Sequence, residues 1–219
     1  MLKKYGKLSG LLILSFFISC AANETHRTLV PETIQNSQGF NGKTARVSIG
    51  QFINRSTYMN GIFADSGDKL GQQAQQILTT HISGSPAFIL ADRRNMAALA
   101  DEAKYSKTTQ NITGAEAVIT GAVTEFGRKE TGTRSLGGLI HKTKTQTLYA
   151  KVSLSMVDVK TSVVKATYQG AGEYNLTNKE VLGIGGYAGY DSTLADKVLN
   201  LAIMEAIKRT VEGREAREW

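Results

Sequence analysis

The chain has 219 residues, and 26 lysines and arginines against 19 aspartates and glutamates give it a formal net charge of +7. This excess is mild and contains no lysine- and arginine-rich run, so it does not favour nucleic-acid binding. The single cysteine cannot form an internal disulfide, and the fold therefore depends on its own hydrophobic core. The length suits one large domain or a domain with insertions.

The start of the chain has the pattern of an export signal. Lys3, Lys4 and Lys7 precede an almost uninterrupted apolar run over 8–19. Roughly a dozen apolar residues are too few for a transmembrane helix, which needs about 20. We therefore predict a signal peptide over 1–19.

Cys20 follows this run directly and is flanked by Ser19 and Ala21. Residues 17–20 (FISC) resemble a bacterial lipobox, in which the thiol becomes the lipidated N-terminus; an ordinary signal peptide and a buried cysteine are the alternative. The lipobox implies diacylglycerol and an N-acyl chain on Cys20, which anchor a protein durably to a membrane. Ala21 is not the aspartate that commonly retains such lipoproteins in the inner membrane, so we expect the periplasmic face of the outer membrane.

The sequence after the signal peptide predicts a polar tether next to the lipid over 20–42 and one domain over 43–213. The first strand is expected over 45–52. Ser66 or Asp68 can cap a helix that ends at Gly84. Its apolar positions have helical spacing: Leu70, Ala74, Ile77, Leu78 and Ile82.

A short buried strand is predicted over 87–91, after which Asp92 is placed to cap a second helix. The inner stripe of that helix would be Met96, Leu99, Ala100 and Ala103. A third strand is expected over 117–126, whereas 127–146 look irregular.

The clearest strand pattern covers 147–159, where alternate residues form one apolar face. These residues are Leu148, Ala150, Val152, Leu154 and Met156. A turn at 158–162 and a partner strand over 163–174 complete a hairpin.

The last predicted helix covers 193–211, with Ser192 as its cap. Its apolar face is broad enough to suggest cover by the sheet and by a neighbouring subunit. The residues of this face are Leu194, Ala195, Val198, Leu199, Ala202, Ile203, Ala206 and Ile207. The order β-α-β-α-β-β-β-α predicts an α/β (α+β) fold with a single mixed sheet and three packed helices.

The sequence offers no pattern typical of an enzyme. His26, His81 and His141 lack partners at metal-ligand spacing, and we expect them to be solvated. The G-x-G-x-x-A match at 183–188 precedes the last element of the chain, so a flexible loop is favoured over a dinucleotide site. We therefore expect no catalytic residue, no metal and no cofactor other than the acyl chains.

Three segments in order carry a family resemblance. They are ARVSIGQFINRS (45–56), FILADRRNMAALADEAKYS (88–106), and AEAVITGAVTEFG (115–127) joined to LYAKVSLSMVDVKTSVVKATYQGAGEY (148–174). With the lipobox, this ordered set resembles the curli production assembly/transport (CsgG) family over about 45–212. The resemblance implies a periplasmic α/β domain that forms a ring at the outer membrane. In the curli transporter, two insertions become hairpins that neighbouring subunits close into one barrel.

The resemblance also implies a loop after the first strand that narrows the channel. By position this loop is 54–63, which makes Tyr58, Asn60 and Phe63 candidate constriction residues. Ordinary anchoring of a surface loop is the alternative for Tyr58 and Phe63.

The insertions here are 127–146 and 176–191. A membrane strand needs about 9–11 residues with alternate apolar positions. The candidates for membrane contact are Leu136, Leu139, Ile140, Ile184, Tyr187 and Tyr190. Because the first insertion also carries five lysines and arginines, a ring lying on the membrane fits better than one passing through it.

Two functions follow. The first is an oligomeric, outer-membrane-associated lipoprotein that resembles the curli secretion channel and exports or assembles a protein at the cell surface. The alternative is a periplasmic adaptor lipoprotein of similar fold, which docks on another envelope protein such as a peptidoglycan synthase.

Overall fold

The computed structural model describes residues 40–58, 67–135, 141–181 and 192–216. The elements are β1 (Ala45–Asn54), α1 (Lys69–Gly84), β2 (Phe88–Leu90), α2 (Met96–Tyr105), β3 (Ala117–Ser135), β4 (His141–Asp158), β5 (Val164–Val181) and α3 (Ser192–Glu215). This order confirms the predicted fold of one mixed sheet with three helices.

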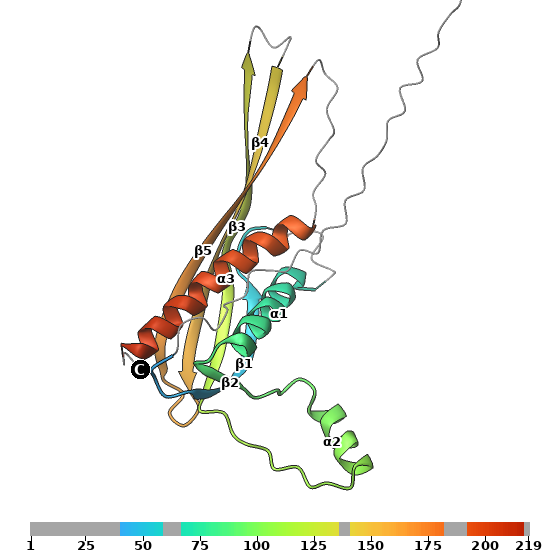
Figure 1. The fold of residues 1–219 in the computed structure, drawn as a ribbon, viewed down its shortest axis with the longest axis vertical. Helices are drawn as coiled ribbons and strands as arrows, with labels where there is room; N and C mark the ends of the chain where they lie inside the picture. Colours follow the sequence, from blue (N-terminus) through green and yellow to red (C-terminus); the bar gives the residue numbers. More distant parts are fainter. Residues whose placement is uncertain (1–39, 59–66, 136–140, 182–191, 217–219) are drawn as a thin grey trace, which may run out of the picture. The chain divides into compact units, whose positions relative to one another are not determined.

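The sheet has the strand order β2-β1-β3-β4-β5. β1 is parallel to both of its neighbours, whereas β4 is antiparallel to both β3 and β5. α1 and α3 lie against one face of this sheet and contact each other (Figure 1). Of the described helices, only these two cover the sheet, because α2 contains no buried residue.

The core lies between the sheet and these two helices. The predicted apolar face of β4, from Leu148 to Met156, is buried as expected. The whole predicted apolar face of α3 is also buried, at no more than 8% exposure. That face contacts β4, β5 and α1 of the same chain. Its breadth therefore does not require cover by a neighbouring subunit, which corrects that expectation.

The prediction of irregular structure over 127–146 is wrong. β3 continues to Ser135 and β4 begins at His141, so most of this insertion is a paired hairpin. β5 likewise continues into the second insertion as far as Val181. In-register pairing between strands satisfies the backbone, and strands can therefore continue where the apolar alternation is lost.

These three strands have 18 or 19 residues, whereas strands in globular proteins have about 3–10. Their outer parts pair as one three-strand ribbon (127–135, 141–149 and 173–181). Thr131, Thr145 and Thr177 are register partners across it. The ribbon extends beyond the part of the sheet that carries β1 and β2 (Figure 1).

Candidate functional site

The residues directly after β1, as far as Tyr58, are fixed at the base of the ribbon. The Asn54 side chain donates to the Tyr58 carbonyl oxygen (2.8 Å) and accepts from the Ser56 amide (2.9 Å) and hydroxyl (2.6 Å). The Tyr58 ring packs on Phe126, with 4.6 Å between ring centroids. Phe126 is the last residue of β3 before the ribbon begins. Tyr58 is therefore anchored at the level where the ribbon leaves the core.

Tyr58 is the member of the predicted constriction set that the structure describes. Asn60 and Phe63 lie outside the described residues. A role of these three residues in narrowing a channel stays a prediction.

Asp68 joins the end of β1 to α1. One carboxylate oxygen accepts from the Gly71 amide (2.7 Å) and the other from the Asn54 amide (2.7 Å). The first contact caps α1, as the sequence predicts. A Cβ on Gly71 would lie 2.2 Å from the Asp68 carboxylate, so glycine is needed where the cap closes on the helix.

The junction between β2 and α2 differs from the prediction. α2 begins after Asn95, and Asp92 lies one turn earlier. The Asp92 carboxylate accepts from the Asn95 side chain (2.6 Å) and from the amides of Arg94 (2.9 Å) and Asn95 (3.2 Å). The hydrogen bond from the Asn95 side chain is the main reason that the pKa of Asp92 is lowered. Asp92 therefore orders the turn before the helix and does not cap the helix itself.

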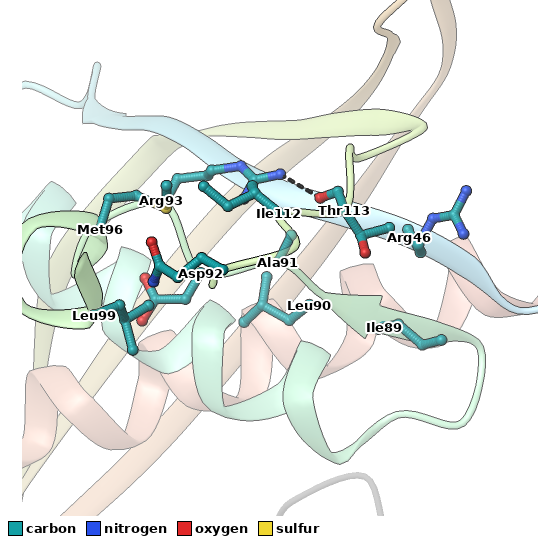
Figure 2. Close-up of a pocket in the computed structure, with 11 residues that line it drawn as sticks. Arg46, Ile89, Leu90, Ala91, Asp92, Arg93, Met96, Leu99, Ile112 and Thr113 are labelled. Carbon is teal, nitrogen blue, oxygen red and sulfur yellow. Dashed lines mark hydrogen bonds between the residues drawn. The ribbon is translucent and has the colours of Figure 1, made fainter. Parts of the chain in front are cut away.

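A cavity of about 270 Å³ lies between this junction, α2 and the segment that returns to β3 (Figure 2). We call it the α2 cavity. Its large apolar lining residues are Ile89, Leu90, Met96, Leu99 and Ile112, and its charged ones are Arg46, Asp92 and Arg93. The Arg93 guanidinium donates to the Thr113 carbonyl oxygen (2.7 Å) and holds the two connecting segments together.

The predicted inner stripe of α2 is not buried. Leu99 is 44% exposed, and Met96, Ala100 and Ala103 are half-buried. α1 and α3 already occupy the covered face of the sheet, and α2 lies on long connections outside that layer (Figure 1). The helical spacing of the apolar residues correctly predicts a helix. It cannot show that no other described element packs against the apolar side of that helix.

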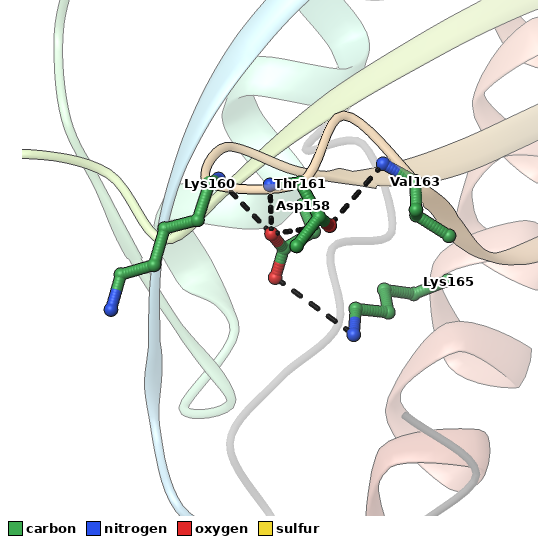
Figure 3. A network of polar contacts seen from close by, with 5 residues as sticks. All are labelled: Asp158, Lys160, Thr161, Val163 and Lys165. Carbon is green, nitrogen blue, oxygen red and sulfur yellow. Dashed lines mark hydrogen bonds and ion pairs between the residues drawn. The ribbon is translucent and has the colours of Figure 1, made fainter.

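The turn between β4 and β5 is ordered by Asp158 (Figure 3). Its carboxylate accepts from the amides of Lys160 (3.0 Å) and Thr161 (2.8 Å) and from the Thr161 hydroxyl (2.8 Å). The hydrogen bonds from Thr161 contribute most to the lowered pKa of Asp158. This turn (158–163) carries two exposed valines, Val159 and Val163. Strand patterning in the sequence assigns Val163 to the partner strand and singles out neither valine.

His81 is the histidine whose side chain the structure describes. His81 is 1% exposed, so the expectation that it is solvated is wrong. Its Nε2 is 2.8 Å from the Asn200 carboxamide oxygen, between α1 and α3. Among the residues that the structure describes, no group of three or more His, Cys, Asp and Glu side chains could hold a metal ion. His141 begins β4, and His26 lies outside the described residues.

Several predicted site residues also lie outside those ranges. They are Cys20 and the membrane-contact candidates Leu136, Leu139, Ile140, Ile184, Tyr187 and Tyr190. The G-x-G-x-x-A match at 183–188 is outside them as well. In the described part of the chain, no helix has the length and apolar character to cross a membrane.

The family described as "Curli production assembly/transport component CsgG" matches residues 31–216. The chain belongs to the CsgG family. A relative from Neisseria meningitidis serogroup B, named "Putative lipoprotein NMB1126/NMB1164", is 44% identical over 200 residues, which are 90% of this chain and 89% of the relative. The predicted CsgG resemblance is thereby confirmed, and this CsgG-family chain has a relative that is named as a lipoprotein.

Solved structures show more distant likeness. The PelC dodecamer from Paraburkholderia phytofirmans is 13% identical, with a TM-score of 0.35, over 76% of this chain and 91% of that chain. The LpoB C-terminal domain from Salmonella enterica is 12% identical, with a TM-score of 0.32, over 60% of this chain and 85% of that chain. Similarity at this level carries no argument about the function or assembly of the present CsgG-family protein.

Proposed function

We propose that this CsgG-family protein is a lipoprotein of the outer membrane that forms a homo-oligomeric ring and exports or assembles a protein at the cell surface. The observation that carries the proposal is the family match over 31–216. Acyl chains on Cys20 would hold the ring at the periplasmic face of the membrane, since two or three chains anchor far more durably than one.

The positions of two features support a channel role. The ribbon of β3, β4 and β5 extends past the core, and Tyr58 is anchored at its base through Phe126. In a ring, Tyr58 would repeat once per subunit at one level. A ring of Tyr58 residues would form a constriction there.

Ion conductance tests this proposal directly. The full-length lipidated protein, extracted in detergent, is examined for its mass and then reconstituted into liposomes for conductance measurements. We expect a ring-sized oligomer that conducts, and a Tyr58→Ala ring that conducts more per channel because a bulky side chain is lost. Tyr105→Ala is the matched control, because Tyr105 is 82% exposed on α2. Monomers in detergent would contradict the ring, and equal conductance of both variants would contradict the constriction.

A non-channel adaptor is the second candidate. The charge of the first insertion favours it, because 127–146 carry Arg128, Lys129, Arg134, Lys142 and Lys144. Each such charge costs about 2–4 kcal/mol when it faces lipid near the bilayer centre. A protein that fails to conduct but crosslinks in cells to a cell-wall synthase would favour the adaptor.

A further inference from the structure

The α2 cavity presents apolar side chains that no other described part of the chain covers, beside charged lining residues such as Arg46 and Asp92. Ile89, Leu99 and Ile112 line it and are 56%, 44% and 54% exposed. Three exposed large apolar side chains around one hollow differ from singly scattered ones, and such patches mark interaction sites. They lie beside β2, which forms one edge of the sheet.

A second apolar surface lies at the opposite edge of the same sheet. Val159 and Val163 of the β4–β5 turn and Val164, which begins the edge strand β5, are 49%, 53% and 54% exposed. The hydrogen bonds to Asp158 hold this turn in one shape (Figure 3). The turn is therefore a pre-ordered apolar projection, whose docking requires little further ordering.

Each of these two surfaces has a charged residue beside it, and the two charges are opposite. Glu102 lies three residues after Leu99, which places both on the same side of α2. Lys160 lies between the exposed valines of the turn, and its side chain points away from Asp158 (Figure 3). Among the described residues, neither Glu102 nor Lys160 has a side-chain ion pair.

We propose that the β4–β5 turn of one copy docks into the α2 cavity of the next copy, with Lys160 facing Glu102 of that neighbour. The two surfaces differ and lie at opposite sheet edges, so the contact is head-to-tail and repeats from copy to copy. A contact of this kind closes into a ring when its rotation allows. The inference rests on the proposed ring and assigns the surfaces that build it.

Disulfide trapping in the full-length lipidated protein tests the contact. Leu99→Cys and Val163→Cys are combined in one chain, oxidised in membranes, and separated on a non-reducing gel. In the proposed lipoprotein the Cys20 sulfur is a thioether and does not compete. We expect a ladder of dimers, trimers and larger species, because each copy would contribute one cysteine to each of two contacts. The pair Leu99→Cys with Tyr149→Cys is the matched control, since Tyr149 is also exposed (42%) but is distant from the turn along β4, and we expect no ladder.

The outcomes separate this inference from the proposed function. A ladder in the double variant alone supports the contact. Dimers from Leu99→Cys alone would indicate a symmetric helix contact and overturn it, as would crosslinks to a different protein. An intact ring in detergent without a ladder would overturn the contact and leave the ring standing, whereas monomers would overturn both.

Charge reversal gives a second readout in the double-cysteine background. We expect Glu102→Lys to reduce the ladder severalfold and Glu102→Lys with Lys160→Glu to restore it. Glu173→Lys, an exposed reversal on β5, is the control and should leave the ladder unchanged. A ladder that Glu102→Lys does not reduce, or that the double reversal does not restore, would overturn the assigned pairing.

Discussion

His81 combines near-complete burial with one unpaired ring nitrogen. Its Nε2–H donates to the Asn200 carboxamide oxygen, and its Nδ1 is buried with no hydrogen-bond partner among the described residues. Burial between α1 and α3 lowers the pKa of His81, and the Asn200 hydrogen bond only partly opposes this effect. The folded protein therefore keeps His81 neutral, because a charged imidazole would bring an N–H without an acceptor into the core.

We expect this histidine to make the fold acid-sensitive. The unfolded chain takes up a proton near the ordinary histidine pKa of about 6.5, whereas the folded chain resists protonation at His81. The free energy of unfolding should therefore fall as pH drops below about 6.5, by up to about 1.4 kcal/mol per pH unit from this group. Urea unfolding of the wild type and His81→Gln at pH 7.5 and 5.5 measures it. Equal pH slopes in the two proteins would contradict this assignment.

Asp68 should contribute through both carboxylate oxygens. Asp68→Ala removes the α1 cap and leaves the Asn54 amide unpaired, so we expect a loss of about 1–2 kcal/mol in the free energy of unfolding. Asp68→Asn retains one acceptor oxygen and should lose roughly half as much. Urea unfolding of both variants compares them, and an equal loss would contradict the two-oxygen bridge.

At the scale of elements, the packing of α3 on β5 depends on two glycines. A Cβ on Gly170 would lie 2.1 Å from the Ala202 carbonyl oxygen, and one on Gly172 would lie 2.6 Å from that of Val198. Both obstacles are helix backbone, which cannot rotate away as a side chain can. The helix therefore approaches the strand more closely than any larger residue would allow.

We expect Gly170→Ala to push α3 away from the sheet and to destabilise the protein by about 1–3 kcal/mol, the usual cost of overpacking. Gly114→Ala is the matched control, because a Cβ there meets nothing within 4 Å. Urea unfolding should show a clear loss for the first variant and a change within about 0.5 kcal/mol for the second. Similar values for both would show that the close approach is not required.

The patterns that could be predicted were those with a local cause. The apolar alternation from Leu148 to Met156 and the apolar stripe of α3 each indicate burial on one face. Asp68 indicates a helix cap. All three features could therefore be predicted from the sequence. The ribbon could not be predicted from the sequence, because its pairing comes from neighbouring strands and its residues lack apolar alternation. α2 shows the converse, since helical spacing predicts a stripe whether or not the chain supplies a surface to cover it. The burial of His81 also depends on α3, more than a hundred residues away, and no local signal reveals it.

At the scale of the whole molecule, anchoring and folding should be separable. The described core begins at β1, well beyond Cys20. We expect Cys20→Ser to move the protein from the membrane fraction to the soluble fraction while its free energy of unfolding stays unchanged. Fractionation with an alkaline wash measures the first, and Ser19→Ala, which keeps a small residue before the cysteine, should remain membrane-bound. A Cys20→Ser protein that stays with the membrane would contradict the proposed lipidation.

The two edges of the sheet differ, and the difference has a consequence for a newly folded copy. Among the described residues, the sheet ends on one side at β2, which has three residues, and on the other side no described strand pairs with the outer edge of β5, which has 18 residues. Such an edge exposes a row of amide and carbonyl groups that any extended polypeptide can adopt as a template. While this edge stays unpaired, two copies can pair edge to edge and aggregate. We therefore expect overproduction to increase the insoluble fraction of the protein.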